Sequence, residues 1–189
     1  MKIKIFILIL TVLQSCSLTV KSQGLQFYRE DIVFEVFEDQ VTTDALYHFC
    51  NVGEKDIKTS LFYPFPGNTR ELIDTLDIRD LKTDQFIPYR DAKAGVFFVI
   101  SVPAYGQAAY RVYFRQRLEE KHFTYILTST ESWGRSLEFA NFKLQIPITL
   151  SIDFLSYPAD STFIQNDIRY FIWKKKDFMP DRDFEITFQ

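Results

Sequence analysis

Aromatic side chains beside polar ones form the candidate ligand site that we favour in this sequence. Trp133 follows Phe123 and Tyr125, with Ser129 and Glu131 between them. The face of an indole can stack on a sugar ring, and nearby hydroxyl and carboxyl groups can hydrogen-bond the sugar. We therefore predict that Trp133, Tyr125 and Glu131 bind a ligand. In the alternative interpretation, Trp133 is a large residue that closes one end of a hydrophobic core.

A second candidate site is a row of arginines on one face of a predicted strand. Arg111, Arg115 and Arg117 lie on the same face and flank Tyr113. Guanidinium groups hydrogen-bond pairs of phosphate or carboxylate oxygens, so this face could bind an anionic ligand such as a phosphate or an acidic glycan. The alternative is a solvated face whose arginines pair with acidic residues on neighbouring strands.

His48 and Cys50 form a third pair that could carry chemistry. They are two residues apart on one predicted strand and therefore share a face. This spacing could give a cysteine nucleophile with its base, or half of a metal site. The alternative, which we favour, is a core face shared with Leu46 and Val52, on which a free cysteine behaves as a small hydrophobic residue.

The sequence carries none of the short motifs that mark common enzyme classes. It has no G-x-S-x-G, no H-E-x-x-H, no Walker or EF-hand loop and no Rossmann glycines. We therefore predict no catalytic residue, no metal site and no cofactor, and a protein that is not an enzyme. A hydrolase whose carboxylates converge only in the folded chain is an alternative.

The N-terminal residues have the pattern of an export signal. Lys2 and Lys4 precede an apolar run at residues 5–13, which is too short to span a bilayer. Residues 13–16 (Leu-Gln-Ser-Cys) resemble a bacterial lipobox, in which Cys16 becomes the first mature residue and carries a lipid that anchors the protein to a membrane.

A second cleavage point is also open. Val20 and Ser22 have the sizes expected before a cleavage that releases a soluble protein from residue 23. Both cuts predict an exported chain of the bacterial cell envelope, lipid-anchored or periplasmic, or a secreted one. We therefore expect a leader and tether at residues 1–22 and a single domain at residues 23–189.

Composition excludes one class of partner and points to a fold class. Loss of Lys2 and Lys4 with the leader lowers the formal net charge from −3 to −5, so we predict no nucleic-acid partner. Aromatic residues make up 17% of the chain, with twenty phenylalanines and ten tyrosines. These residues suit half-buried strands.

Alternation of apolar and polar residues is the dominant pattern and positions the candidate residues. Tyr110, Val112, Phe114 and Leu118 fall on one face of residues 108–118. Gln116 is the exception on that face, and the arginines fall on the other. We expect residues 122–127 to return as the partner strand. Residues 95–102 are apolar enough to be buried on both faces and to form a hairpin with 108–118.

The remaining segments complete an all-β chain. Similar alternation predicts further short strands, which begin or centre near residues 32, 44, 57, 76, 142, 150, 168 and 184. About ten such strands separated by turn residues are typical of an antiparallel β-sandwich. One short helical turn is expected at residues 129–134, where Ser or Thr can cap and Glu131 lies early.

Two motifs resemble those of an exported bacterial β-sandwich family described only as a domain of unknown function. The strand end at residues 47–51 (Tyr-His-Phe-Cys-Asn) is similar to the family's aromatic-x-Phe-x-Asn strand end. Residues 125–130 with Trp133 are similar to its Tyr-x-Leu-Thr-Thr stretch and following Trp. The resemblance covers most of residues 25–150 and implies fold and export, without an activity.

These observations together predict a non-enzymatic protein that acts in binding or assembly. An edge strand would pair with a partner, or a loop end would hold a ligand. The expected partner is an envelope protein or a glycan. A carbohydrate-binding module that uses Trp133 and nearby aromatic residues is the main alternative.

Overall fold

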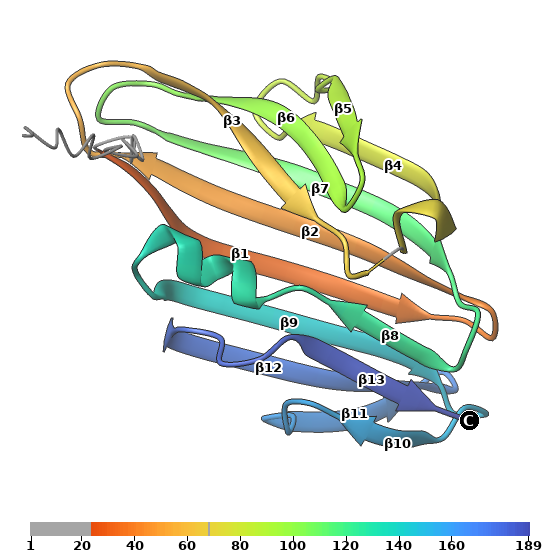
Figure 1. Ribbon diagram of the computed structural model, residues 1–189. Helices are drawn as coiled ribbons and strands as arrows, with labels where there is room; N and C mark the ends of the chain where they lie inside the picture. Colours follow the sequence, from red (N-terminus) through yellow and green to blue (C-terminus); the bar gives the residue numbers. More distant parts are fainter. Residues whose placement is uncertain (1–23, 68) are drawn as a thin grey trace, which may run out of the picture.

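The computed structural model describes residues 24–67 and 69–189 and shows two packed layers of β-structure (Figure 1). One layer is a seven-stranded sheet in which every neighbouring pair is antiparallel except the parallel pair β1 and β9. Its strands, in spatial order, are β11 (Ser161–Gln165), β12 (Ile168–Phe178), β9 (Leu137–Pro147), β1 (Leu25–Val36), β2 (Gln40–Asn51), β7 (Gln107–Arg117) and β4 (Ile73–Asp80).

The second layer is divided into two three-stranded sheets. The first contains β3 (Ile57–Pro64), β6 (Gly95–Val102) and β5 (Tyr89–Ala92), and the second contains β10 (Ile152–Leu155), β13 (Phe184–Phe188) and β8 (His122–Tyr125). β3 and β8 are each the edge of their own sheet, and no pairing joins them among the described residues. The layer is therefore split between these two strands, and this split positions the candidate site.

Two short 3₁₀ helices complete the described chain: η1 (Thr69–Leu72) and η2 (Thr128–Trp133). η2 confirms the predicted helical turn, and it ends at Gly134, whose φ of 67° is the left-handed conformation that suits glycine. η2 begins three residues after the end of β8 and lies beside the split in the second layer (Figure 1).

Alternation along the strands produces the core between the layers, as predicted. Tyr110 and Phe114 are 2% exposed and Val112 is fully buried, so the apolar face of β7 points inward. Phe34 is also fully buried and packs on aromatic rings of the other layer, stacked on Phe184 at 4.8 Å between centroids. The prediction of an all-β sandwich is confirmed.

The predicted strand partners on both sides of β7 are wrong. β6 does not form a hairpin with β7, because β6 lies in the small sheet with β3 and β5, while β7 lies between β2 and β4. Likewise, β8 pairs only with β13 and does not return along β7. Both connections cross between the layers, and the first turns at Tyr105, whose φ is 52°.

Other details also differ from the predictions. Residues 95–102 are buried on one face only, since Val99 is 43% exposed and Ser101 is exposed. Two strands were not predicted, namely β5 and β11. β5 has four residues and pairs only with β6, and all five residues of β11 are exposed, so neither carries a core-facing alternation.

The predicted leader lies outside the described residues, and so do Cys16, which we predicted to carry a lipid, and both candidate cleavage points. Within the part of the chain that the structure describes, no helix is long and apolar enough to cross a membrane.

Candidate functional site

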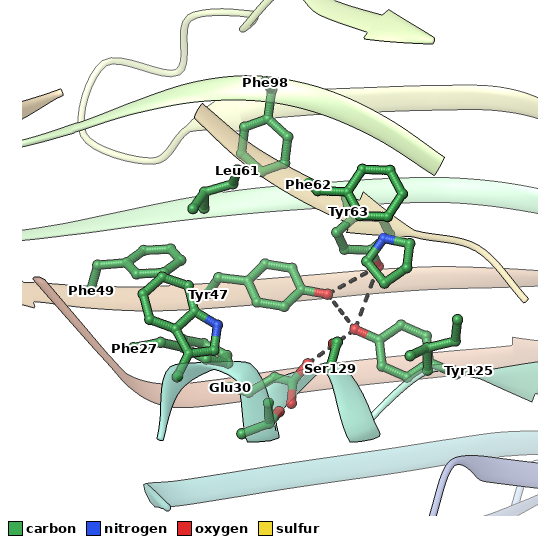
Figure 2. Close-up of a pocket in the computed structure, with 14 residues that line it drawn as sticks. Phe27, Glu30, Tyr47, Phe49, Leu61, Phe62, Tyr63, Phe98, Tyr125 and Ser129 are labelled. Carbon is green, nitrogen blue, oxygen red and sulfur yellow. Dashed lines mark hydrogen bonds between the residues drawn. The ribbon is translucent and has the colours of Figure 1, made fainter. Parts of the chain in front are cut away.

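A cavity of about 80 Å³ lies where the second layer is split (Figure 2). Its floor is formed by Glu30 of β1 and Tyr47 of β2, both in the seven-stranded sheet. Tyr63 of β3 lines one side, Tyr125 of β8 lines the other, and η2 contributes Ser129, Thr130 and Trp133. We call this cavity the slot. Phe98 of β6 also lines the slot, so five strands and one helix position its side chains.

The polar groups of the slot form one connected cluster of oxygen atoms (Figure 2). The Tyr47 hydroxyl donates to the Tyr63 oxygen at 3.0 Å, and the Tyr63 hydroxyl donates to the Tyr125 oxygen at 3.4 Å. Tyr47 and Tyr125 also contact one another directly through their hydroxyl groups. The Tyr125 hydroxyl donates to Oε1 of Glu30 at 3.0 Å.

Glu30 is the acidic residue of this cluster, and it is only 3% exposed. Its Oε2 atom is buried and has no hydrogen-bond partner among the described residues. Burial raises the pKa of Glu30 to about 8; the nearby Asp31 adds to the rise, and the hydrogen bond from Tyr125 opposes it. The carboxyl group is thus held mainly in its neutral form at pH 7.

The number of protons in the cluster agrees with a neutral Glu30. Four oxygen–oxygen contacts join the three tyrosine hydroxyls and Glu30. Each tyrosine has a single proton to donate, so three protons serve four contacts when Glu30 is ionised. A proton on Glu30 supplies the fourth. When that proton is lost, the carboxylate has capacity to accept a hydrogen bond at Oε2, which has no partner among the described residues.

An outer groove of about 550 Å³ adjoins the slot and shares several of its walls. Leu61 and Phe62 of β3 and Ser129 and Trp133 of η2 line both spaces. Eight of the fourteen residues that line the slot are aromatic. Within the part of the chain that the structure describes, no lysine, arginine or histidine lines either space, and the acidic side chains are Glu30 in the slot and Glu131 in the groove.

Trp133 lies between the core and the candidate site. It packs on Phe27 and Phe49 of the core at centroid distances of 5.7 and 5.5 Å. It is nevertheless half-buried, and its remaining surface borders the slot and the groove. The structure brings Trp133 together with Tyr125 in the slot and with Glu131 in the groove.

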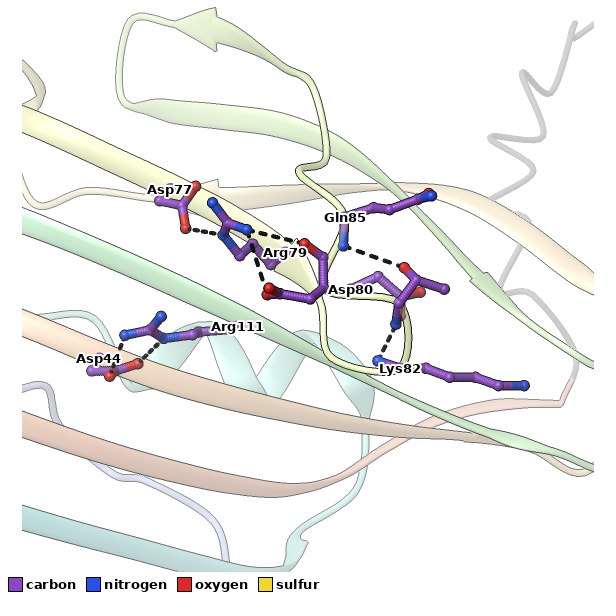
Figure 3. A network of polar contacts seen from close by, with 9 residues as sticks. Asp44, Asp77, Arg79, Asp80, Lys82, Gln85 and Arg111 are labelled. Atoms are coloured by element: carbon purple, nitrogen blue, oxygen red, sulfur yellow. Dashed lines mark hydrogen bonds and ion pairs between the residues drawn. The ribbon is translucent and has the colours of Figure 1, made fainter.

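The predicted arginine row lies away from the slot, on the outer face of the seven-stranded sheet. Arg111 forms a two-pronged ion pair with Asp44, with both N–O distances 2.7 Å (Figure 3). Arg115 pairs with Asp74 at 2.8 Å. Arg117 is exposed at the end of β7 and forms no ion pair within the described chain. Two of the three guanidinium groups are thus neutralised by acids on neighbouring strands.

Similar pairing continues along this face. Arg79 contacts Asp77 at 2.6 Å and Asp84 at 3.4 Å (Figure 3). His48 Nε2 lies 3.1 Å from Asp31 Oδ2. The outer face therefore carries many exposed or half-buried polar pairs. Pairs of this kind contribute little to the free energy of unfolding.

The favoured interpretation of His48 and Cys50 as part of a core face is wrong. The inward residues of β2 include Ala45 and Phe49, so His48 and Cys50 point to the outer face, where both are half-buried. Burial lowers the pKa of His48 and raises the pKa of the Cys50 thiol. A neutral thiol is a poor nucleophile, and His48 is oriented toward Asp31.

Within residues 24–67 and 69–189, no group of three or more His, Cys, Asp and Glu side chains could hold a metal ion. The described residues contain two histidines, His48 and His122, and one cysteine, Cys50, which is free.

Three of the four residues in the hydrogen-bonded cluster were not predicted from the sequence: Glu30, Tyr47 and Tyr63. The sequence did point to Glu30. It alternates with Ile32 and Phe34 on the buried face of β1, and an acidic residue at a core position is unusual. No such signal exists for the two tyrosines, which can occupy a core face without special function.

One family description matches part of the chain. Residues 107–187 match a domain of unknown function, DUF4424. The match is to a domain of unknown function, and it runs from β7 to β13 rather than over residues 25–150, where the resemblance was expected. It includes Tyr125 and Trp133 and carries no information about export. No curated protein sequence matches the chain.

Solved structures share the fold at low sequence identity. A Legionella pneumophila protein provisionally named as nutrient-binding has a TM-score of 0.71 and 14% identity, over 87% of this chain and 67% of its own. An M1 zinc metallopeptidase from Deinococcus radiodurans has a TM-score of 0.52 and 9% identity, over 87% of this chain and 43% of its own. The chain thus spans less than half of the peptidase. At these identities the similarity establishes the fold alone.

Proposed function

We propose that this protein binds a small organic ligand, without catalysis, at the split between β3 and β8. The ligand would place a polar end in the slot beside Glu30 and its body in the outer groove against Trp133. The observation that carries this proposal is that Glu30 lines a cavity with mainly aromatic walls and that its buried Oε2 has no hydrogen-bond partner among the described residues. Buried polar groups are almost always hydrogen-bonded, so this atom marks a place for an external partner.

The sizes of the two spaces support this arrangement. A cavity of about 80 Å³ admits a small polar group, and the groove of about 550 Å³ can hold the rest of a metabolite-sized molecule. The slot is preformed because each of the five strands that line it is fixed by sheet pairing. The shared fold with a provisionally named nutrient-binding protein agrees with this function.

The location of this function rests on the N-terminal sequence. A lysine-bearing start and a nine-residue apolar run favour export, and the Leu-Gln-Ser-Cys stretch favours a lipid on Cys16. We therefore place the site outside the cytoplasm, on a protein of the bacterial cell envelope. The intact mass of the mature protein tests this: a lipidated chain that begins at Cys16 supports an anchor, and an unmodified chain that begins at residue 23 excludes it.

Ligand screening with a blocked variant tests the binding site. We would measure thermal stabilisation of the purified protein by a panel of amines, amino acids, sugars and carboxylates. Ser129→Phe fills the wall shared by slot and groove, and Ser161→Phe adds the same side chain on the exposed strand β11. A ligand of the slot should stabilise the wild type and Ser161→Phe but not Ser129→Phe. Equal stabilisation of both variants would contradict the proposal.

Carbohydrate binding is a second candidate, favoured by the composition of the outer groove. Trp133 shares this groove with the hydroxyl groups of Ser129 and Ser132 and the carboxylate of Glu131. An indole with hydroxyl and carboxylate neighbours suits a sugar ring. Trp133→Ala should abolish glycan retention on an array, whereas Trp133→Phe, which keeps an aromatic face, should retain part of it. Unchanged retention by Trp133→Ala would exclude this candidate.

Assembly through a strand edge is favoured by a separate observation. β11 is the edge of the seven-stranded sheet, all five of its residues are exposed, and Phe163 and Ile164 are 47% and 60% exposed. Such an edge can pair with a partner chain. If it does, Ile164→Lys should abolish copurification of an envelope partner that the wild type retains. Retention by both would exclude this edge.

A further inference from the structure

We infer that the slot selects a protonated amino group, so that the ligand is a small organic amine whose ammonium group sits between Glu30 and the tyrosine oxygens. This inference rests on the proposed binding function and specifies its ligand class. Three independent features of the slot carry it: its hydrogen-bond capacity, its charge and its aromatic walls.

Hydrogen-bond capacity comes first. The single protons of Tyr47, Tyr63 and Tyr125 are already directed to neighbouring oxygens in the cluster, and Glu30 Oε2 has no partner among the described residues. Once Glu30 has lost its proton, what remains free in the cluster is the ability to accept. An ammonium group carries three donors and no acceptor. It matches this free capacity, whereas a carboxylate would offer only further acceptors.

Charge gives the second argument. Among the described residues, Glu30 is the only acidic side chain that lines the slot, Glu131 is the only one that lines the groove, and no lysine, arginine or histidine lines either. An anionic ligand would therefore meet two carboxyl groups and no counter-charge. A cation can pair with Glu30, and the buried setting makes that pairing stronger than at the surface.

The aromatic walls give the third argument. Phe27, Tyr47, Phe62 and Trp133 border the slot with rings. Ring faces attract cations electrostatically, and this attraction increases when the cation is removed from water. Because Phe27 already packs on Tyr47 and Trp133, these three rings need little rearrangement to receive the ligand.

Binding of such a ligand is coupled to the release of a proton. Burial raises the pKa of Glu30 to about 8, so pairing with a cation requires Glu30 to lose its proton. The groups that face Glu30 are Tyr47 on β2, Tyr63 on β3 and Tyr125 on β8, with Asp31 adjacent on β1. Burial raises the pKa of each of these tyrosines above its ordinary value, so they stay neutral between pH 6 and 9. An alkylammonium ion, like a lysine side chain, also keeps its charge there.

Three probes of equal length test the inference: n-butylammonium, n-butanol and butyrate. Each is titrated into protein with labelled tyrosine rings while NMR follows the signals of Tyr47 and Tyr125. We expect n-butylammonium to shift these signals and to bind about tenfold more tightly at pH 9 than at pH 7, because the ionised fraction of Glu30 rises about tenfold. Glu30→Gln should weaken binding at least tenfold, and Glu119→Gln, in the exposed turn after β7, should not change it.

Each other outcome overturns the inference. If n-butanol or butyrate shifts the same signals as strongly, the slot binds ligands but does not select amines, and the proposed function survives alone. If n-butylammonium binds equally well to Glu30→Gln, the carboxylate is not the anchor. If no probe shifts the slot signals, selection of amines is excluded, while the wider ligand panel decides the proposed function separately.

Discussion

Replacement of Glu30 by glutamine should change how the stability of this protein depends on pH. The variant keeps the size of the side chain but removes its titration. Folding moves the pKa of Glu30 from its ordinary value of 4.5 to about 8. Between these values the native state holds a proton that the unfolded state has lost, so the free energy of unfolding falls as pH rises.

The size of this effect follows from the two pKa values. Each pH unit in this window costs about 1.4 kcal/mol, so the wild type should lose about 4 kcal/mol between pH 5 and 8 relative to Glu30→Gln. Below pH 4.5 the full contribution is present, and above pH 8 the loss levels off. Contributions from other groups, such as His48, are common to both proteins and cancel in the difference.

Urea unfolding at five pH values from 5 to 9 measures this difference. Fluorescence of Trp173, which is fully buried, reports the transition. Glu119→Gln serves as the matched control because its carboxyl group is exposed, and its curve should run parallel to that of the wild type. If Glu30→Gln also runs parallel to the wild type, then Glu30 is not held neutral by burial and the electrostatic description of the slot is wrong.

Three further predictions concern the fold. Phe34→Ala should lower the free energy of unfolding by about 3–5 kcal/mol, since a fully buried ring is removed from between the layers; a loss below about 1 kcal/mol in urea unfolding would contradict this packing. Arg111→Ala should cost less than about 1 kcal/mol, because its pair with Asp44 is over a third exposed, and the cost should shrink further in high salt. Gly95→Ala should destabilise by more than about 1 kcal/mol, because its φ is 154° and an added Cβ would lie 2.1 Å from the carbonyl oxygen of Tyr63; an unchanged melting temperature would refute this.

The sequence predicted the faces of the strands better than their partners. The alternation of Tyr110, Val112 and Phe114 fixes which side of β7 is buried, because side chains on a strand alternate with a period of two. Alternation does not report which strand lies alongside. The predicted hairpins on both sides of β7 failed for this reason, since each connection crosses from one layer to the other.

Only the part of the candidate site whose residues are close together in the sequence was predicted. Tyr125, Glu131 and Trp133 lie within nine residues of one another, so their proximity could be read directly from the chain. Glu30 is 95 residues from Tyr125, and only the split in the second layer brings them within hydrogen-bond distance. Contacts between strands so distant in sequence depend on the topology, which period-two patterning leaves open.

NMR signals of the Glu30 carboxyl carbon during addition of n-butylammonium test the central claim most directly, because that claim is that the buried carboxyl group of the slot receives the ligand. The account predicts that the titration midpoint of Glu30 lies near 8 in the free protein and moves to lower pH as the amine is added. A midpoint near 4.5 in the free protein, or one that the amine leaves unchanged, would contradict it.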